Sequence, residues 1–249
     1  MKLLKFSIVS LLFTSLLAIS SSANATVVLF KTNMGDFEVN LFDKETPETV
    51  NNFLRYIETG AYQNSIVHRS VPNFIVQGGG FTYNIENNNV VDEVKFTAVQ
   101  NEPVFSNVRG TIAMAKLGSN PDSATNQWFF NVEDNGGNLD NQNEGFTAFG
   151  TVTGNGMEII DAINNLEQYS IQGLSAFTQT PLQAEPSGDG ITEEHFVLIE
   201  SITVIDANED TSPNLPPKST AKSDDSSGGG TIFWLLTILS LGLIRRAAK

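Results

Sequence analysis

The chain has 249 residues, of which 28 are acidic and 14 are basic, and it contains no cysteine. The lack of cysteine excludes disulfide bonds, thiolate metal ligands, a cysteine nucleophile and a lipid-modified cysteine anchor. A net charge of −14 combined with 40% hydrophobic residues indicates a folded acidic protein. It argues against nucleic-acid binding, which needs a cationic face to neutralise phosphates.

The N-terminus has the organisation of a secretory signal peptide. Lys2 and Lys5 precede an apolar run over residues 6–19, and residues 23–25 read Ala-Asn-Ala. A short apolar run with this ending favours cleavage after Ala25 over the alternative, an N-terminal transmembrane anchor. We therefore expect a signal peptidase to remove residues 1–25. The mature protein is then exported to the periplasm or the cell surface.

The mature chain is predicted to begin with a β-hairpin and a helix. Residues 27–30 and 36–42 have the pattern of two strands, and they flank a short turn that ends in Gly35. Thr46 is the predicted N-cap of a helix that starts at Pro47 and stops at Gly60. The apolar face of this helix, which we expect to cover a sheet, comprises Val50, Phe53, Leu54 and Ile57.

The rest of the domain is predicted to consist mainly of short strands. A second helix fits residues 157–165, whereas the long polar segment 166–190 fits no element. Many short strands without regular β-α-β alternation predict a mainly antiparallel barrel or sandwich. The further strands are expected over residues 66–69, 73–77, 111–115, 127–132, 147–152 and 196–205.

The C-terminal part is predicted to lie outside the folded domain. Residues 207–227 are rich in Asp, Ser, Pro and Lys and indicate a polar linker. Residues 228–249 begin with three glycines, which a short apolar run and a basic end follow. They resemble GlyGly-CTERM sorting signals of Gram-negative bacteria, which a rhomboid-type protease removes. A retained transmembrane anchor is the alternative. The domain, residues 26–206, then holds 24 acidic and seven basic side chains, a charge of −17.

Several site types find no support in the residues. The chain has two histidines, His68 and His195, at no zinc-ligand spacing, and His195 is expected to face solvent. The chain has no nucleophile elbow, and the glycines at 78–80 lack the remainder of a phosphate-binding loop. The loop 134–145 departs from a calcium loop, because Thr151 stands where the bidentate Glu belongs after Asp140. We therefore expect neither a metal nor a cofactor.

Two regions place single polar residues among large apolar ones. Residues 66–81 contain His68, Arg69 and Gln77, and residues 110–132 combine small and amide side chains with aromatic ones. Strand alternation puts Gln127 and Phe129 on one face. Taken singly, Arg69 could be an ion-paired surface residue and the phenylalanines could be ordinary core residues.

Taken together, these segments resemble the cyclophilins, which are peptidyl-prolyl cis-trans isomerases, and most of all their exported bacterial branch. The resemblance covers nearly all of residues 26–206. It implies a closed eight-stranded antiparallel barrel capped by two helices, and we expect a monomer. The motifs that carry it are residues 68–81, residues 109–115, Ser123-Ala124-Thr125 with Gln127 and Phe129, Leu139-Asp140, and Phe149-Gly150.

The resemblance also implies roles for individual side chains. Arg69 matches the catalytic arginine, and Gln77 and Gln127 match the amides that hold the peptide backbone. Phe74, Phe129 and Leu139 match the proline pocket, and Ala115 matches part of the peptide groove. Two further positions of the groove differ from common family residues: Ile75 stands where Met is common, and Phe146 stands where His or Tyr is common. Asn138 replaces an aromatic wall of the pocket and Lys116 stands where some relatives have Asn. His68 is interpreted as a structural imidazole, since the reaction transfers no proton.

The predicted function is therefore prolyl isomerisation that assists the folding of exported proteins. The partners are proline-containing polypeptides, the signal peptidase and the sorting protease. One alternative is a peptide-binding chaperone or surface module with little turnover, which the Asn138 replacement suggests. A third interpretation makes the acidic surface the functional element, which would recruit basic partners.

Overall fold

The computed structural model describes residues 26–84, 86–87, 89–186, 190–207 and 216–217. The expected signal peptide, the expected tail 228–249 and most of the expected linker lie outside these residues. Two linker prolines are described: the amide of Ser106 donates to the carbonyl of Pro216 at 3.1 Å, and Pro217 forms a bridge with Phe105. Among the described residues no helix is long and apolar enough to cross a membrane.

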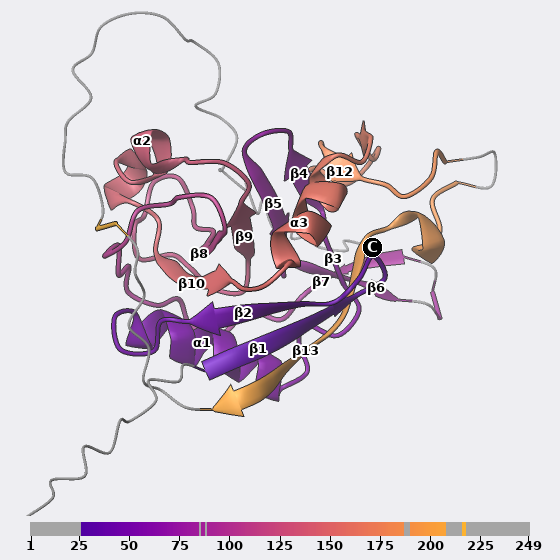
Figure 1. Ribbon diagram of the computed structural model, residues 1–249. Helices are drawn as coiled ribbons and strands as arrows, with labels where there is room; N and C mark the ends of the chain where they lie inside the picture. Colours follow the sequence, from indigo (N-terminus) through magenta and orange to yellow (C-terminus); the bar gives the residue numbers. More distant parts are fainter. Residues whose placement is uncertain (1–25, 85, 88, 187–189, 208–215, 218–249) are drawn as a thin grey trace, which may run out of the picture.

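The main structure is one large antiparallel sheet, as the strand patterns predicted (Figure 1). Its hydrogen-bonded order is β4-β5-β9-β8-β10-β2-β1-β13-β3-β6-β7. The strands are β1 (Thr26–Thr32), β2 (Phe37–Leu41), β3 (Ser65–Ile66), β4 (Arg69–Val71), β5 (Ile75–Gly78), β6 (Phe81–Asn84), β7 (Asn89–Asp92), β8 (Thr111–Met114), β9 (Trp128–Asn131), β10 (Ala148–Val152) and β13 (Leu198–Ala207). A separate pair joins β11 (Gln168–Tyr169) to β12 (Thr180–Pro181).

Both predicted helices form. They are α1 (Pro47–Glu58) and α3 (Gly156–Asn164), and a short helix, α2 (Gly136–Leu139), and the 3-10 turns Gln142–Glu144 and Glu193–His195 are also present. Thr46 occupies the N-cap position of α1, but its hydroxyl donates to the carbonyl of Phe42 instead of capping the helix. The cap comes from Glu102, whose carboxylate accepts the backbone N–H groups of Glu48 and Thr49. This carboxylate satisfies two orphan donors and meets the positive end of the helix dipole.

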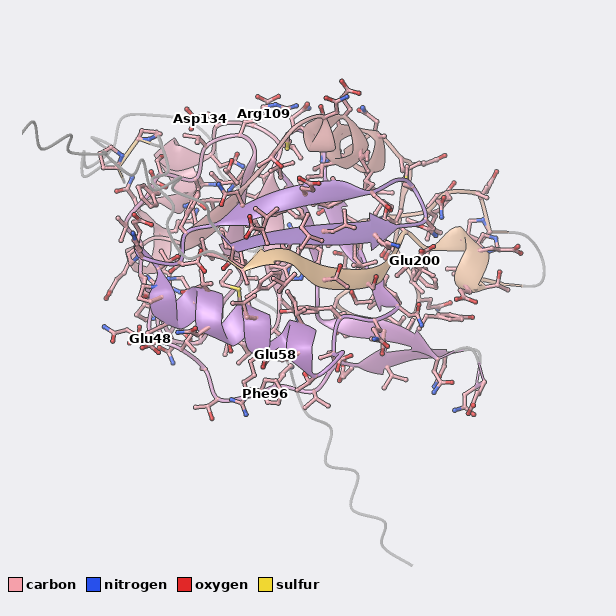
Figure 2. All side chains as sticks on the ribbon, turned by 60° about the horizontal axis from the view of Figure 1, so that its bottom comes forward. Glu48, Glu58, Phe96, Arg109, Asp134 and Glu200 are labelled. Carbon is pink, nitrogen blue, oxygen red and sulfur yellow. The ribbon has the colours of Figure 1, made fainter. Side chains whose placement is uncertain are left out.

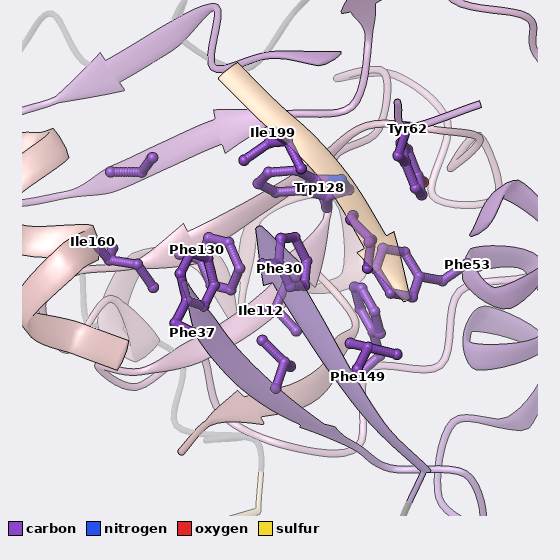
Figure 3. Packing of buried hydrophobic residues seen from close by; sticks show 14 of the residues in the cluster. Phe30, Phe37, Phe53, Tyr62, Ile112, Trp128, Phe130, Phe149, Ile160 and Ile199 are labelled. Atoms are coloured by element: carbon purple, nitrogen blue, oxygen red, sulfur yellow. The ribbon is translucent and has the colours of Figure 1, made fainter. Parts of the chain in front are cut away.

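The core lies between the inner face of the sheet and the two longer helices (Figure 3). Phe30 stacks on Phe37 with 4.9 Å between ring centroids, and it meets Trp128 edge-on at 5.5 Å. Helix α1 contributes Phe53 and α3 contributes Ile160, and both side chains are fully buried. On the outer side of α1, the guanidinium of Arg55 lies over the ring of Phe96, which Figure 2 shows beside this helix.

The unassigned polar segment and the second histidine differ from the sequence expectations. Residues 166–190 contain the β11–β12 pair and pack Phe177 and Leu182 into a third apolar cluster with Phe196. The expectation that His195 faces solvent is wrong. Its side chain is 8% exposed, because Nδ1 is held by the hydroxyl and the backbone N–H of Thr192.

Candidate active site

The predicted site residues that lie on β4, β5 and β9 share the sheet face that points away from the core. In the register of β4, β5 and β9, Arg69 stands opposite Gln77, and Gln77 stands opposite Phe129. The row continues through Ala113 on β8 to Ala148 on β10. Residues that face each other in a ladder share one face. The next row, which includes Val76 and Phe130, belongs to the core, so the alternation of the strands separates the site from the core.

Three polar side chains of the site form a hydrogen-bonded chain. Nη1 of Arg69 donates to Oε1 of Gln77 at 3.2 Å, and Nε2 of Gln77 donates to Oε1 of Gln127 at 2.9 Å. Arg69 is only 5% exposed, and its Nη2 has no hydrogen-bond partner among the described residues. Burial lowers the pKa of the guanidinium to about 10, which still leaves it charged at neutral pH. The site therefore holds a desolvated cation whose Nη2 can donate a hydrogen bond to a ligand.

Apolar side chains form one side of the site, where Phe129 stands opposite Gln77. The rings of Phe129 and Phe146 meet edge-on with centroids 5.8 Å apart, and Nζ of Lys116 lies 5.0 Å from the Phe146 centroid. All the apolar residues predicted for the site belong to one cluster, which includes Ile75, Ala115, Phe129, Leu139 and Phe146, with half-buried Phe74 packed against them. The structure thus brings together all nine predicted site residues.

The three consecutive glycines have a specific packing reason. A Cβ at Gly78 would lie 2.7 Å from the Trp128 ring, and a Cβ at Gly80 would lie 2.5 Å from Nε2 of Gln127. Gly79 also has a φ of +79°, which favours glycine. The glycines therefore let Trp128 and Gln127 lie directly against the backbone that follows β5.

His68 precedes Arg69 in the chain and packs against aromatic rings outside the apolar cluster of the site. The imidazole is fully buried and meets the rings of Phe81 and Phe177 at 4.9 and 5.8 Å. Burial, reinforced by the nearby charge of Arg69, lowers the pKa of His68 to about 3. A neutral imidazole among aromatic rings is consistent with the structural role predicted for it.

A pocket of about 120 Å³ adjoins the amide end of the site. Two of its lining residues, Lys95 and Leu117, were not indicated by the sequence motifs, and the others are Ala115, Lys116, Ser123, Thr125 and Gln127. Lys95 comes from a distant loop, so no local spacing could have placed it here. Nζ of Lys116 donates to the carbonyls of Asn143 and Gly145, which ties this cation to the loop that follows α2.

Two other expectations concern residues near the pocket. Asn138, which stands where relatives carry an aromatic side chain, is half-buried and accepts a hydrogen bond from Gln142. In the loop that was considered for calcium, Asp140 is fully buried and accepts hydrogen bonds from Ser106 and Asn107. Within the described part of the chain no group of three or more His, Cys, Asp or Glu side chains could hold a metal ion.

Comparison with known proteins identifies the family to which this arrangement belongs. A family model described as cyclophilin type peptidyl-prolyl cis-trans isomerase/CLD matches residues 27–183. The chain is 41% identical over 152 residues to a peptidyl-prolyl cis-trans isomerase of Acinetobacter baylyi, covering 60% of this chain and 78% of that protein. It is 36% identical over 184 residues to peptidyl-prolyl cis-trans isomerase B of Escherichia coli, covering 72% of this chain and 99% of the relative.

The fold comparison agrees. The structure matches the crystal structure of a cyclophilin type peptidyl-prolyl cis-trans isomerase of Cryptosporidium parvum, determined in the presence of the dipeptide Ala-Pro. The TM-score is 0.53 at 21% identity, and the match covers 72% of this chain and 99% of the other.

Proposed function

The chain belongs to the cyclophilin-type peptidyl-prolyl cis-trans isomerases, and from this premise we propose that it uses Arg69 and the surrounding cluster to isomerise X-Pro bonds of exported polypeptides. The observation that carries the proposal is the buried Nη2 of Arg69, which lacks a partner among the described residues beside apolar walls. A substrate amide can supply that partner. The proline ring would lie against Phe74, Phe129 and Leu139.

The chemistry follows from the electronic structure of the X-Pro amide. Resonance gives the C–N bond a rotation barrier of about 18–20 kcal/mol, and isomerisation without a catalyst takes tens of seconds or longer. In the twisted state the proline nitrogen becomes pyramidal and regains its lone pair. A guanidinium donor to that nitrogen, or to the neighbouring carbonyl, stabilises the twisted state more than either planar isomer. No bond is made or broken and no proton is transferred.

The energetics require more than one hydrogen bond. Raising a rate from ~10⁻² to ~10³ s⁻¹ lowers the barrier by roughly 7 kcal/mol. One charge-assisted hydrogen bond contributes about 1.5–3 kcal/mol. The remainder must come from the pocket as a whole. The hydrogen-bonded chain of Arg69, Gln77 and Gln127 supports a contribution from the whole pocket, because it orients the cation and both carboxamides before the substrate arrives.

The cellular setting is also part of the proposal. Residues 1–25 support export, and residues 228–249 support either a GlyGly-CTERM sorting signal cut by a rhomboid-type protease or a retained membrane anchor. The isomerase would then work in the periplasm or at the surface of a Gram-negative bacterium. The intact mass of the native protein tests both processing steps, since each removes a segment of known mass.

We further propose that the sheet closes into the eight-stranded barrel. Only Val67 and His68 separate β3 from β4, and only Gly79 and Gly80 separate β5 from β6. If each pair is one interrupted strand, the sheet has eight strands plus β7. The strand over residues 65–71 then pairs with β13 at its start and with β5 at its end. This double pairing supports closure.

The test of the site is the variant Arg69→Ala in the full-length protein. We expect kcat/KM for cis-to-trans isomerisation of an Ala-Pro peptide, measured by NMR exchange, to fall about 10- to 100-fold. Arg55→Ala is the control, because Arg55 lies over Phe96 away from the site. Equal activity of the Arg69→Ala variant and the wild type would remove Arg69 from the mechanism. Binding of the peptide by the wild type without exchange between its isomers would favour a peptide-binding module instead.

A further inference from the structure

The hairpin formed by β4 and β5 presents much of the site, including Arg69, Phe74 and Gln77. On one side it pairs with β9, but the other edge of β4 would be free if the sheet ended there. An unpaired edge strand would leave the backbone that carries Arg69 without support. What holds this edge therefore matters for the geometry of the site.

The segment that the sequence left unassigned covers this edge. The backbone N–H of Ser70 donates to the carbonyl of Gln179 at 2.7 Å. The hydroxyl of Thr180 donates to the carbonyl of His68 at 2.9 Å, and Thr180 is fully buried. These two bonds flank Arg69 on both sides along the chain. The backbone of Arg69 is thus held between β5 and the region of β12.

The turn of the same hairpin is held mainly by the side chain of Asn164 at the end of α3, and Nδ2 of Asn135 also donates to the carbonyl of Phe74 at 2.9 Å. Nδ2 of Asn164 lies within hydrogen-bond distance of Oγ of Ser70 at 2.8 Å and of the carbonyls of Val71 at 3.0 Å and Ile75 at 3.4 Å. Its Oδ1 accepts the backbone N–H of Asn73 at 3.1 Å. Asn164 is 8% exposed, and Asn73 has a φ of +56° that this bond helps to maintain.

We propose that Asn164 and Thr180 are positioning residues that brace the Arg69 hairpin for catalysis, with residues 166–182 serving to deliver Thr180. Neither residue belongs to the apolar cluster of the site, so each acts through the hairpin. A small displacement of a preorganised group can cost up to about 100-fold in rate. Of the three residues that match the proline pocket, Phe129 and Leu139 are carried by other elements, and only Phe74 lies in the turn of the hairpin. The brace should therefore affect kcat more than KM. The inference rests on the proposed role of Arg69.

The experiment compares four variants of the full-length protein with Arg69→Ala, using the same peptide assay. Thr180→Val removes the bond to His68, and Thr180→Ser retains a hydroxyl. Asn164→Ala removes the turn bonds. Asn33→Ala is the matched control, because its amide bonds the backbone of Phe196 and Leu198 and does not touch the hairpin.

We expect Asn164→Ala and Thr180→Val each to lower kcat about five- to tenfold while KM stays within about twofold. Thr180→Ser should restore kcat, and Asn33→Ala should lower the melting temperature without changing kcat. The brace is overturned if Asn164→Ala and Thr180→Val lose no more kcat than Asn33→Ala, or if Thr180→Ser fails to restore it. If Arg69→Ala itself has wild-type activity, the proposed site fails instead. Should Asn164→Ala fail to fold, the Thr180 pair decides the question.

Discussion

Nη1 of Arg69 donates a hydrogen bond to Oε1 of Gln77, with 3.2 Å between the two atoms, and the two residues face each other across β4 and β5. The contact fixes one end of the guanidinium with a neutral partner. A neutral acceptor orients the cation without cancelling its charge, which a carboxylate in the same place would do. The choice of glutamine over glutamate therefore matters for the proposed mechanism.

Replacement of this partner gives a direct test of the charge. Gln77→Glu should form an ion pair with Arg69 and lower kcat/KM more than tenfold, because the cation is then neutralised toward the substrate. Gln77→Leu removes the orienting bond but keeps the free charge, so its loss of kcat/KM should be smaller. Isomerisation kinetics of both variants show whether activity depends more on the orientation of the Arg69 guanidinium or on its uncancelled charge. An equal loss in the two variants would mean that charge neutralisation is not the dominant effect.

The glycine at position 80 gives a second prediction for the same row of side chains. A Cβ there would lie 2.5 Å from Nε2 of Gln127, and the flexible amide can yield where a backbone could not. Gly80→Ala should therefore displace Gln127, raise KM severalfold and change the free energy of unfolding by only about 1 kcal/mol. Gly137→Ala is the control, since a Cβ there meets nothing within 4 Å. An unchanged KM would show that Gln127 does not hold the peptide.

His68 predicts how stability depends on pH. Its pKa is about 3 in the folded protein, against 6.5 as the ordinary value, so between these pH values the unfolded chain binds the extra proton. The contribution of His68 to the free energy of unfolding is therefore fully present above pH 6.5, and it is lost as the pH falls toward 3. Between pH 7 and pH 5 this one residue should account for a loss of about 2 kcal/mol in the free energy of unfolding.

The measurement is urea unfolding of wild type and His68→Leu at both pH values. The variant should lose about 2 kcal/mol less than the wild type over this interval, whatever its absolute stability. The carboxylates titrate in both proteins and cancel in the comparison. The same pH dependence in both proteins would show that folding does not lower the pKa of His68.

The strands and helices that local patterns could specify were predicted well. The first hairpin, α1, α3 and the strands that carry Gln77 and Phe129 all form, because each has alternating or helical periodicity. The strands β6 and β7 were missed, since each has only four residues beside an asparagine-rich connection and they form by pairing with each other at the sheet edge. Residues 166–190 were not assigned for a related reason: Phe177 and Leu182 are spaced by no regular period and bury against distant strands.

The candidate site shows the same contrast between residues that local sequence indicates and residues that only distant contacts bring into place. The nine predicted residues came from motif resemblance and lie together in the structure. Three others depend on contacts between residues far apart in sequence: Lys95, Asn164 and Thr180 reach the site or its hairpin from separate loops and elements. Burial of His195 was mispredicted for this reason too, because the acidic neighbours that suggested exposure do not set its environment.

Lys95 gives the last prediction, which concerns substrate preference. It lines the 120 Å³ pocket beside Gln127 with Lys116, in a domain of charge −17. Peptides with Glu two or three residues before the proline should be isomerised with a kcat/KM about two- to fivefold above those with Lys, as an exposed charge pair contributes up to about 1 kcal/mol. Lys95→Glu should reverse this preference, whereas Lys31→Glu on β1 should not. In 1 M salt the difference should largely vanish, because charges then interact over only about 3 Å. A preference that survives both Lys95→Glu and high salt would mean that the pocket selects side chains by shape.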